Sequence, residues 1–409
     1  MEPQVAENKT FENVAATVGR ALGEALPALL GAVTSRGAGP QQIATTLGLD
    51  KGVASRLLKS LRSRDPFGLL QGLPGPEPLR RIVRAAEDKG AAAPVVVAAG
   101  AAIDQFDFLI RAYAGDRATF DGIIGQLLPD ARGPFESRTK QLLFRGFSQL
   151  KGFRSDVEFT TFLIVPSREG PFVDYVVLFG SHGLQRLRPG AEVRLASWMM
   201  AIGGEPWRIT TLDGQPLTDW QAGRLDEFCT TPPPRIRVSQ SGGTNHYTLA
   251  DDGFGPNAKV DLVFGQWSRN SAPLHSQPPE QRRSGVGAEI DRPTCLLQLD
   301  VLVHRSIYPG VDPELHMIDT TFRGMANIND PARKPDWVAL GERIEPLGSD
   351  PARFRTAHVA RYAELLGLAS RVSGHELAEF RGYRLLVEYP PYGLQIGMGF
   401  ARPFPPGDR

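Results

Sequence analysis

The chain has 409 residues and a formal net charge of +1, with 41% of its residues hydrophobic and 22% charged. This length and composition predict a globular protein of two or three domains. The near-zero net charge excludes a global basic field, so any contact with nucleic acid needs a local basic patch. Two cysteines, Cys229 and Cys295, are too few for a secreted disulfide framework, and we interpret both as structural.

The N-terminal segment, MEPQVAENKTFENV, carries acidic residues and has no basic stretch followed by an apolar core, so we expect no signal peptide. The longest uncharged apolar stretch, residues 91–103, is mostly alanine and contains Pro94. A membrane-spanning helix needs about 20 apolar residues, which is more than this stretch supplies. We therefore expect a soluble, cytoplasmic protein that does not contact a membrane.

Residues 10–150 repeat apolar side chains at helical spacing, with glycine and proline as interruptions. Near the start of this region Val14, Val18, Leu22 and Leu26 are four residues apart and share one stripe. No segment there alternates well enough to predict a long strand. The N-terminal part of the chain is therefore predicted to be helical.

Residues 43–61, IATTLGLDKGVASRLLKSL, read as two short helices joined at a glycine. Apolar residues four apart give each helix one buried stripe, formed by Ile43 and Leu47 and by Val53, Leu57 and Leu61. Gly48 ends the first helix in the left-handed region, and Asp50 caps the second. Two helices joined this tightly cross steeply, which is the geometry of a helix-turn-helix.

Basic residues are concentrated around the second helix of this pair. Between residues 36 and 64 there are six basic residues and one acid, a local charge of +5: Arg36, Lys51, Arg56, Lys59, Arg62, Arg64 and Asp50. In a recognition helix, small polar residues approach base edges and long cations reach phosphates. The residues expected to enter the major groove are Lys51, Gly52, Ser55 and Arg56. The residues expected to contact the DNA backbone are Gln41, Gln42, Lys59 and Arg62.

The helix pair resembles the helix-turn-helix of bacterial winged-helix transcriptional regulators of the IclR and MarR type. The matching elements are Ile43-Ala44, Leu47-Gly48-Leu49, Asp50, and Ser55-Arg56-Leu57-Leu58 leading to Leu61. The resemblance implies a regulator that binds double-stranded DNA, and such regulators usually bind as homodimers. Those families place a short hairpin wing after the recognition helix. Here prolines at 66, 74, 76 and 78 follow it, so the wing is either remodelled or missing.

In an alternative interpretation the helix pair forms but does not bind DNA. Similar winged helices serve only as dimerisation domains in small-molecule O-methyltransferases, and a scaffold can use such a pair to bind protein. A methyltransferase needs a glycine-rich turn between a strand and a helix to bind its cofactor. The two candidate segments, SGVGAE at 284–289 and IGMGFA at 396–401, fall in a predicted loop and a predicted hairpin. Neither has that context.

From about residue 155 the sequence favours strands. Segments rich in β-branched and aromatic residues recur in two blocks, 156–266 and 294–322, which are either halves of one sheet domain or a decayed duplication.

Three further elements are predicted in this part of the chain. Residues 271–293 are proline-rich and aperiodic, which predicts a long surface loop. A last helix is predicted to begin after Asp350, with Pro351 in its first turn. The alternating residues of 383–400, with a turn at 390–393, predict a hairpin that closes the sheet.

No catalytic signature appears after residue 150. The seven histidines lie far apart without an HExxH motif, and there is no GxSxG elbow and no P-loop. We therefore expect no enzyme activity, no metal and no cofactor. Four tryptophans fall in the sheet-rich region, and such residues either fill cores or line pockets: Trp198, Trp207, Trp220 and Trp267. A small-molecule or protein effector is the partner expected there.

Taken together, these patterns predict an α+β protein. We assign residues 1–90 to a helix-turn-helix DNA-binding domain and residues 91–153 to a helical connector that pairs two protomers. Residues 154–409 are assigned to a sensing or assembly domain with a mixed or antiparallel sheet and a few helices.

Overall fold

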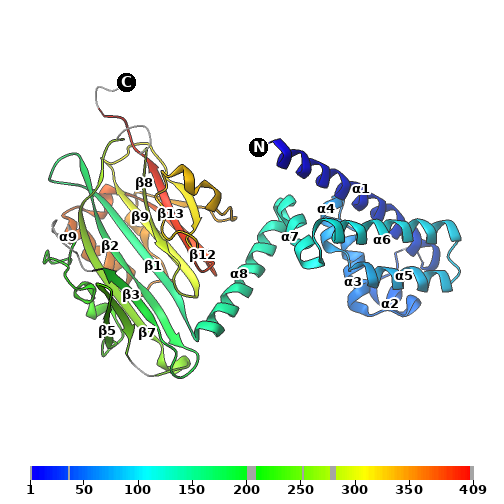
Figure 1. Cartoon of the computed structure of the whole chain (residues 1–409), viewed down its shortest axis with the longest axis horizontal. Helices are drawn as coiled ribbons and strands as arrows, with labels where there is room; N and C mark the ends of the chain where they lie inside the picture. Colours follow the sequence, from blue (N-terminus) through cyan, green and yellow to red (C-terminus); the bar gives the residue numbers. More distant parts are fainter. Residues whose placement is uncertain (1, 36, 200–208, 251–252, 277–281, 406–409) are drawn as a thin grey trace. The chain divides into compact units, whose positions relative to one another are not determined.

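A computed structural model describes residues 2–35, 37–199, 209–250, 253–276 and 282–405 (Figure 1). Contacts divide the chain into two compact units, residues 1–136 and residues 137–409. The first unit is helical and the second is built mainly of strands, so the predicted α+β class is confirmed.

Seven helices belong to the first unit: α1 (Glu2–Val33), α2 (Pro40–Leu47), α3 (Lys51–Ser60), α4 (Pro66–Gly72), α5 (Pro76–Asp88), α6 (Ala93–Tyr113) and α7 (Arg117–Leu127). An eighth, α8 (Pro129–Lys151), begins in the first unit and ends in the second. The predicted stripe of α1 is buried from Val18 onward, with Leu22 and Leu26 fully covered, and it packs with Ile103 and Phe106 of α6. Val14, at its start, is partly buried. This helical unit therefore has a core of its own.

Among the described helices, α6 is the one long and apolar enough to cross a membrane by length and composition alone. This helix is longer than the apolar stretch at residues 91–103, because it continues past Asp104 and Asp107 to Tyr113. Both aspartates accept hydrogen bonds from Arg80 of α5, at 3.0 and 2.9 Å. Core helices of soluble proteins pass the same test, and one face of α6 lies in the core of the helical unit.

The second unit has these strands: β1 (Phe153–Pro166), β2 (Phe172–Arg186), β3 (Arg194–Met199), β4 (Ile209–Thr210), β5 (Ile236–Ser241), β6 (Thr244–Leu249), β7 (Val260–Pro273), β8 (Arg283–Glu289), β9 (Thr294–His304), β10 (Glu314–Asp319), β11 (Glu345–Gly348), β12 (Phe380–Glu388) and β13 (Leu394–Ala401). Its helical elements include α9 (Tyr362–Ser373) and six short 3₁₀ turns, η1 (Trp220–Gly223), η2 (Asp226–Phe228), η3 (Pro256–Ala258), η4 (Pro331–Asp336), η5 (Pro351–Phe354) and η6 (Leu377–Glu379).

Seven of these strands form one sheet in the order β11-β12-β9-β1-β2-β7-β4. Its central pair, β1 and β9, is parallel, and the remaining neighbours are antiparallel. The two strand-rich blocks of the sequence therefore contribute to a single sheet. Two three-stranded sheets, β10-β13-β8 and β3-β6-β5, complete the unit.

The large sheet has a core on each side. On one face, residues such as Leu163 pack with Leu365 and Leu366 of α9. On the other face, Leu299 of β9 packs with Ile396 of β13, so the small sheet β10-β13-β8 covers this side. Figure 1 shows α9 and β13 on either side of the large sheet.

The predicted C-terminal hairpin is wrong. β12 pairs with β9 and β11, whereas β13 pairs with β8 and β10. The segment at 390–393 carries the chain from one sheet to the other, and the apolar sides of β12 and β13 share one core. Alternation identified both strands and their buried faces, but it cannot distinguish a neighbour within a sheet from a partner across a core.

Two further boundaries differ from the prediction. The predicted loop at 271–293 is wrong in two places, because β7 continues to Pro273 and β8 occupies Arg283–Glu289, while residues 277–281 lie outside the described residues. Two glycines contribute to the low apolar content of β8. A Cβ on Gly287 would lie 2.4 Å from the Ile396 carbonyl oxygen of β13, and a Cβ on Gly285 would lie 2.7 Å from the Ile328 side chain.

The last helix begins later than predicted. Asp350 does act as a cap and accepts a hydrogen bond from the Ala352 amide, but the turn it starts is only η5. The α-helix α9 begins at Tyr362, directly after Arg361, whose φ is +53°. A left-handed residue interrupts helical hydrogen bonding, so the apolar pattern alone placed the start too early.

One glycine sets the spacing of two central strands. Gly180 of β2 lies where a Cβ would be 2.1 Å from the Leu262 carbonyl oxygen of β7. We expect Gly180→Ala to lower the free energy of unfolding by about 1–3 kcal/mol, because the backbone must shift to admit the methyl group. Urea unfolding followed by tryptophan fluorescence measures this change, since all five tryptophans lie in residues 137–409.

The matched control is Gly146→Ala, in an exposed part of α8 with open space around the new methyl group. Alanine favours a helix interior over glycine by about 0.5–1 kcal/mol, so this variant should be as stable as the unchanged chain or slightly more so. Equal stability of both alanine variants would show that β2 and β7 have room to separate.

Candidate nucleic-acid interface

Helices α2 and α3 are joined through the two residues expected to shape their turn. Gly48 has φ +62° and donates from its backbone N–H to the Ala44 carbonyl oxygen, which ends α2. The carboxylate of Asp50 accepts from the Gly52 and Val53 amides, at 2.7 and 3.4 Å, which caps α3. Both predicted roles are confirmed.

The back of the pair belongs to the core of the helical unit. Ile43 and Leu47 of α2 are buried, as are Ala54 and Leu57 of α3. Val53 and Leu61, which the sequence placed on the same stripe as Leu57, are only partly buried. The hydroxyl of Ser60 continues this buried line and donates to the Arg56 carbonyl oxygen at 2.8 Å. The opposite side of α3 is thereby left to solvent within the unit.

All eight residues predicted to contact DNA are exposed within the helical unit: Gln41, Gln42, Lys51, Gly52, Ser55, Arg56, Lys59 and Arg62. Lys51, Lys59 and Arg62 form no ion pair with any residue that the structure describes. Arg36, which contributed to the local charge, lies outside the described residues. The structure thus places the predicted residues on α3, on the start of α2 and, for Arg62, in the turn that follows α3.

Three of these residues also have contacts within the protein that the sequence did not indicate. Arg56 donates from Nε to the Gly72 carbonyl oxygen at 3.0 Å, which ties α3 to the end of α4. Gln42 donates to the Ser35 hydroxyl at 2.8 Å. A Cβ on Gly52 would lie 2.8 Å from the capping oxygen of Asp50, so the cap itself favours glycine there.

The sequence did not indicate the role of Arg117, which holds the end of α4, the helix that Arg56 of α3 contacts. Arg117 of α7 donates from Nη2 to the carbonyl oxygens of Leu70, Gln71 and Leu73, at 2.8, 3.1 and 3.2 Å. These carbonyls lie at the end of α4, where a helix has no partners of its own for them. Burial lowers the pKa of Arg117, and Asp121 opposes that shift. An arginine at a helix start carries no sequence signal for this distant contact.

Helices take the place in the chain where winged-helix regulators have their hairpin. Residues 61–92 are all described and contain α4 and α5 but no strand. The prolines at 66 and 76 occupy the first position of these helices, where proline is well tolerated. Any DNA contact beyond α2 and α3 therefore has to come from helices or their connections.

The two glycine-rich segments considered for a methyltransferase cofactor lie in β8 and β13, which pair with each other. Gly285 opposes Gly399, and Gly287 opposes Gly397. Neither strand leads into a helix in the described chain. These glycines allow two strands to approach closely, which differs from a dinucleotide-binding turn.

The second unit contains a cavity of about 680 Å³ on one face of the large sheet. Aromatic rings line part of it: Phe179 and Phe264 stack with centroids 5.5 Å apart, and Trp220 lies 4.0 Å from Phe264. An ion pair between Glu158 and Arg292, with Oε2 and Nη2 3.1 Å apart, lies at its wall. Apolar walls with a few polar groups are typical of small-molecule sites.

The three of these four tryptophans that the structure describes lie in different places. Trp220 lines this cavity. Trp267 lies on β7, and the guanidinium carbon of Arg269 lies 3.4 Å from the centroid of its ring. Trp198 lies on β3, and Trp207 falls outside the described residues. Of the three described tryptophans, one lines the cavity that an effector would occupy.

No protein-family model, curated protein or solved structure matches the chain. The similarity of α2 and α3 to winged-helix regulators is thus carried by the residues of this helix pair alone.

Proposed function

We propose that the chain is a bacterial, cytoplasmic transcriptional regulator that binds double-stranded DNA through α3. The observation that carries this proposal is the exposed cationic surface of α3 and the turn after it, where Lys51, Lys59 and Arg62 have no ion-pair partner in the described chain. Phosphates supply such partners, and the buried apolar back of the helix holds it rigidly enough to enter a groove.

In this proposal the start of α3 faces the bases. Lys51, Gly52, Ser55 and Arg56 enter the major groove, where short side chains permit close approach. Lys59 and Arg62 contact phosphates. Gln41 and Gln42 contact phosphate from the first turn of α2, where backbone amides also point outward.

Two protomers bind together in this proposal, because one helix pair covers only one half-site. The outer side of α6 supports such pairing. Val97 and Phe108 are 69% and 68% exposed there, within the helical unit. Large apolar side chains exposed on one helix are typical of a surface that pairs with another chain.

The cavity lined by Trp220 and Phe264 is the proposed effector site. Its aromatic walls favour a small molecule with a flat apolar part, and the nearby Glu158–Arg292 pair offers charged groups to orient it.

The proposal is tested by recovering genomic fragments on the full-length chain at two salt concentrations. We expect fragments at low salt and a steep loss at high salt, because phosphate contacts release counterions. Ser55→Glu should reduce recovery at least about tenfold, since an acid in the middle of the exposed face repels phosphates at a cost of several kcal/mol. Ser55 is exposed and contributes nothing to the core, so the fold should persist.

The matched control is Thr17→Glu, which adds the same charge to an exposed position of α1 beside Arg20. This variant should recover fragments as the unchanged chain does. Recovery that is equal for both glutamate variants, or absent for the unchanged chain at low salt, would remove α3 as the binding surface.

A further inference from the structure

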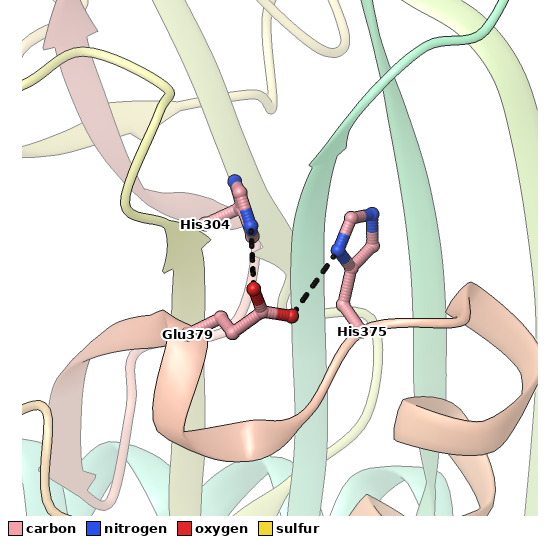
Figure 2. A group of neighbouring side chains, drawn as sticks. All are labelled: His304, His375 and Glu379. Carbon is pink, nitrogen blue, oxygen red and sulfur yellow. Dashed lines mark ion pairs between the residues drawn. The ribbon is translucent and has the colours of Figure 1, made fainter.

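Two histidines and a glutamate that are distant in sequence meet at one edge of the second unit (Figure 2). His304 is the last residue of β9. His375 follows Gly374, whose φ of +74° ends α9. Glu379 ends η6, one residue before Phe380, and Phe380 pairs with His304 in the large sheet. The sheet register therefore brings the three side chains together.

Figure 2 shows the Glu379 carboxylate pointing between the two imidazole rings. Its Oε1 lies 3.8 Å from Nε2 of His304, and its Oε2 lies 3.5 Å from Nδ1 of His375. One ligand atom from each residue lies within 4.8 Å of the other two. Ligands at about 2.0–2.1 Å around a tetrahedral metal are roughly 3.3 Å apart, so small side-chain rotations suffice to reach that geometry.

Other contacts hold these side chains in place. Nδ1 of His304 lies 2.8 Å from the Ser306 hydroxyl and accepts from the Ser306 amide at 3.3 Å, and Nε2 is the nitrogen that faces Glu379. An ion bound at Nε2 requires the ring proton to lie on Nδ1, which can then donate to the Ser306 hydroxyl. The Glu376 amide donates to Oε2 of Glu379 at 3.1 Å. The backbone oxygen of His375 accepts from the Ser370 hydroxyl at 2.7 Å. Outer contacts of this kind orient the ligands of a metal site.

The surroundings of the cluster combine an apolar wall with access from solvent. Phe380 lies edge-on to both rings and forms an apolar wall. The side chains of His375 and Glu379 are 26% and 29% exposed, so an ion can enter from solvent. Arg305, 3.3 Å from Glu379 and largely exposed, is free to turn aside.

We propose that His304, His375 and Glu379 bind one Zn²⁺ ion through Nε2, Nδ1 and the carboxylate, with water as the fourth ligand. Two imidazoles and one carboxylate suit zinc, whereas Mg²⁺ and Ca²⁺ prefer oxygen ligands throughout. Three protein ligands leave one position open, as in zinc sites that exchange a ligand. The site is independent of the DNA-binding proposal, since it lies in the other unit.

Metal binding to the full-length, untagged chain tests this proposal. After treatment with a chelator, titration with Zn²⁺ followed by calorimetry should give one tight site per chain. Co²⁺ in place of Zn²⁺ should give the intense visible absorption bands of a four-coordinate ion. Zn²⁺ should also raise the unfolding temperature, because it binds the folded chain.

Two ligand variants locate the site. His375→Ala and Glu379→Gln should each weaken Zn²⁺ binding by more than about 100-fold, because even outer partners of metal ligands contribute 10–100-fold. Both side chains are partly exposed, and glutamine keeps an acceptor for the Glu376 amide, so folding should be retained. Circular dichroism checks this.

The matched controls are His358→Ala and Glu364→Gln, which make the same kinds of change at exposed residues outside the cluster. Both should bind Zn²⁺ as tightly as the unchanged chain. The proposal is overturned if the unchanged chain shows no tight site, if cobalt gives only the weak spectrum of a hydrated ion, or if the two ligand variants bind as the controls do.

Discussion

Asp300→Ala is expected to lower the free energy of unfolding of residues 137–409 by about 3–5 kcal/mol. Asp300 lies in β9 at the centre of the large sheet and is fully buried. Its carboxylate accepts from Nε and Nη2 of Arg384 at 2.9 and 2.6 Å, and from the Tyr362 hydroxyl at 2.6 Å. Removing it leaves the Arg384 guanidinium buried without its counter-charge, which is the main cost.

Urea unfolding followed by tryptophan fluorescence measures the effect, since the tryptophans report on this unit alone. The matched control is Glu364→Ala, which removes an exposed ion pair with Arg361 in the same region and should leave the midpoint nearly unchanged. The double variant Asp300→Leu/Arg384→Met should lose less stability than the sum of its single changes, because neither charge is then left alone. If Asp300→Ala unfolds at the same urea concentration as the control, the loss of the Arg384 counter-charge does not destabilise this unit.

The double variant Lys59→Ala/Arg62→Ala is expected to weaken DNA binding roughly 60-fold per protomer at 0.1 M salt. Each phosphate contact contributes about 0.9 to the slope of log affinity against log salt, so the slope should fall in magnitude by about 1.8. The loss should be similar for every sequence, because phosphates carry no base identity. Mobility-shift titrations over a range of salt concentrations give both quantities.

The matched control is Arg20→Ala/Lys89→Ala, which removes two exposed charges from α1 and the end of α5. If DNA were attracted by positive charge anywhere on the helical unit, both double variants would change the slope of log affinity against log salt by the same amount. Only a change confined to Lys59 and Arg62 agrees with phosphate contacts made by the α3 surface. Arg56 is left out of this variant because its hydrogen bond to Gly72 mixes a structural role with a binding role.

The helix pair was predictable because its information is local. A glycine at the turn, an aspartate two residues later and leucines four apart define both helices, their ends and their buried side. Gly48, Asp50 and Leu57 take the places predicted for them. The partners of Arg56 and Gln42 were not predictable, because they come from segments whose approach depends on how the whole unit packs.

The second unit shows the opposite case. Alternation predicted the buried faces of β12 and β13, but their pairing depends on β8, β9, β10 and β11, which other parts of the chain supply. The cluster of His304, His375 and Glu379 was hidden for the same reason. His375 and Glu379 share a helical spacing, yet His304 joins them only through the pairing of β9 with β12. Sequence separation therefore made each histidine look isolated.

The parallel pairing of β1 with β9 also constrains the order of events during synthesis. β1 can pair with β2 as soon as both leave the ribosome, but its other edge stays open until residue 304 has been made. Such distant pairings slow folding and expose an unpaired strand edge to aggregation. We expect the nascent second unit to depend on chaperones through this interval, whereas the helical unit, complete far earlier, does not.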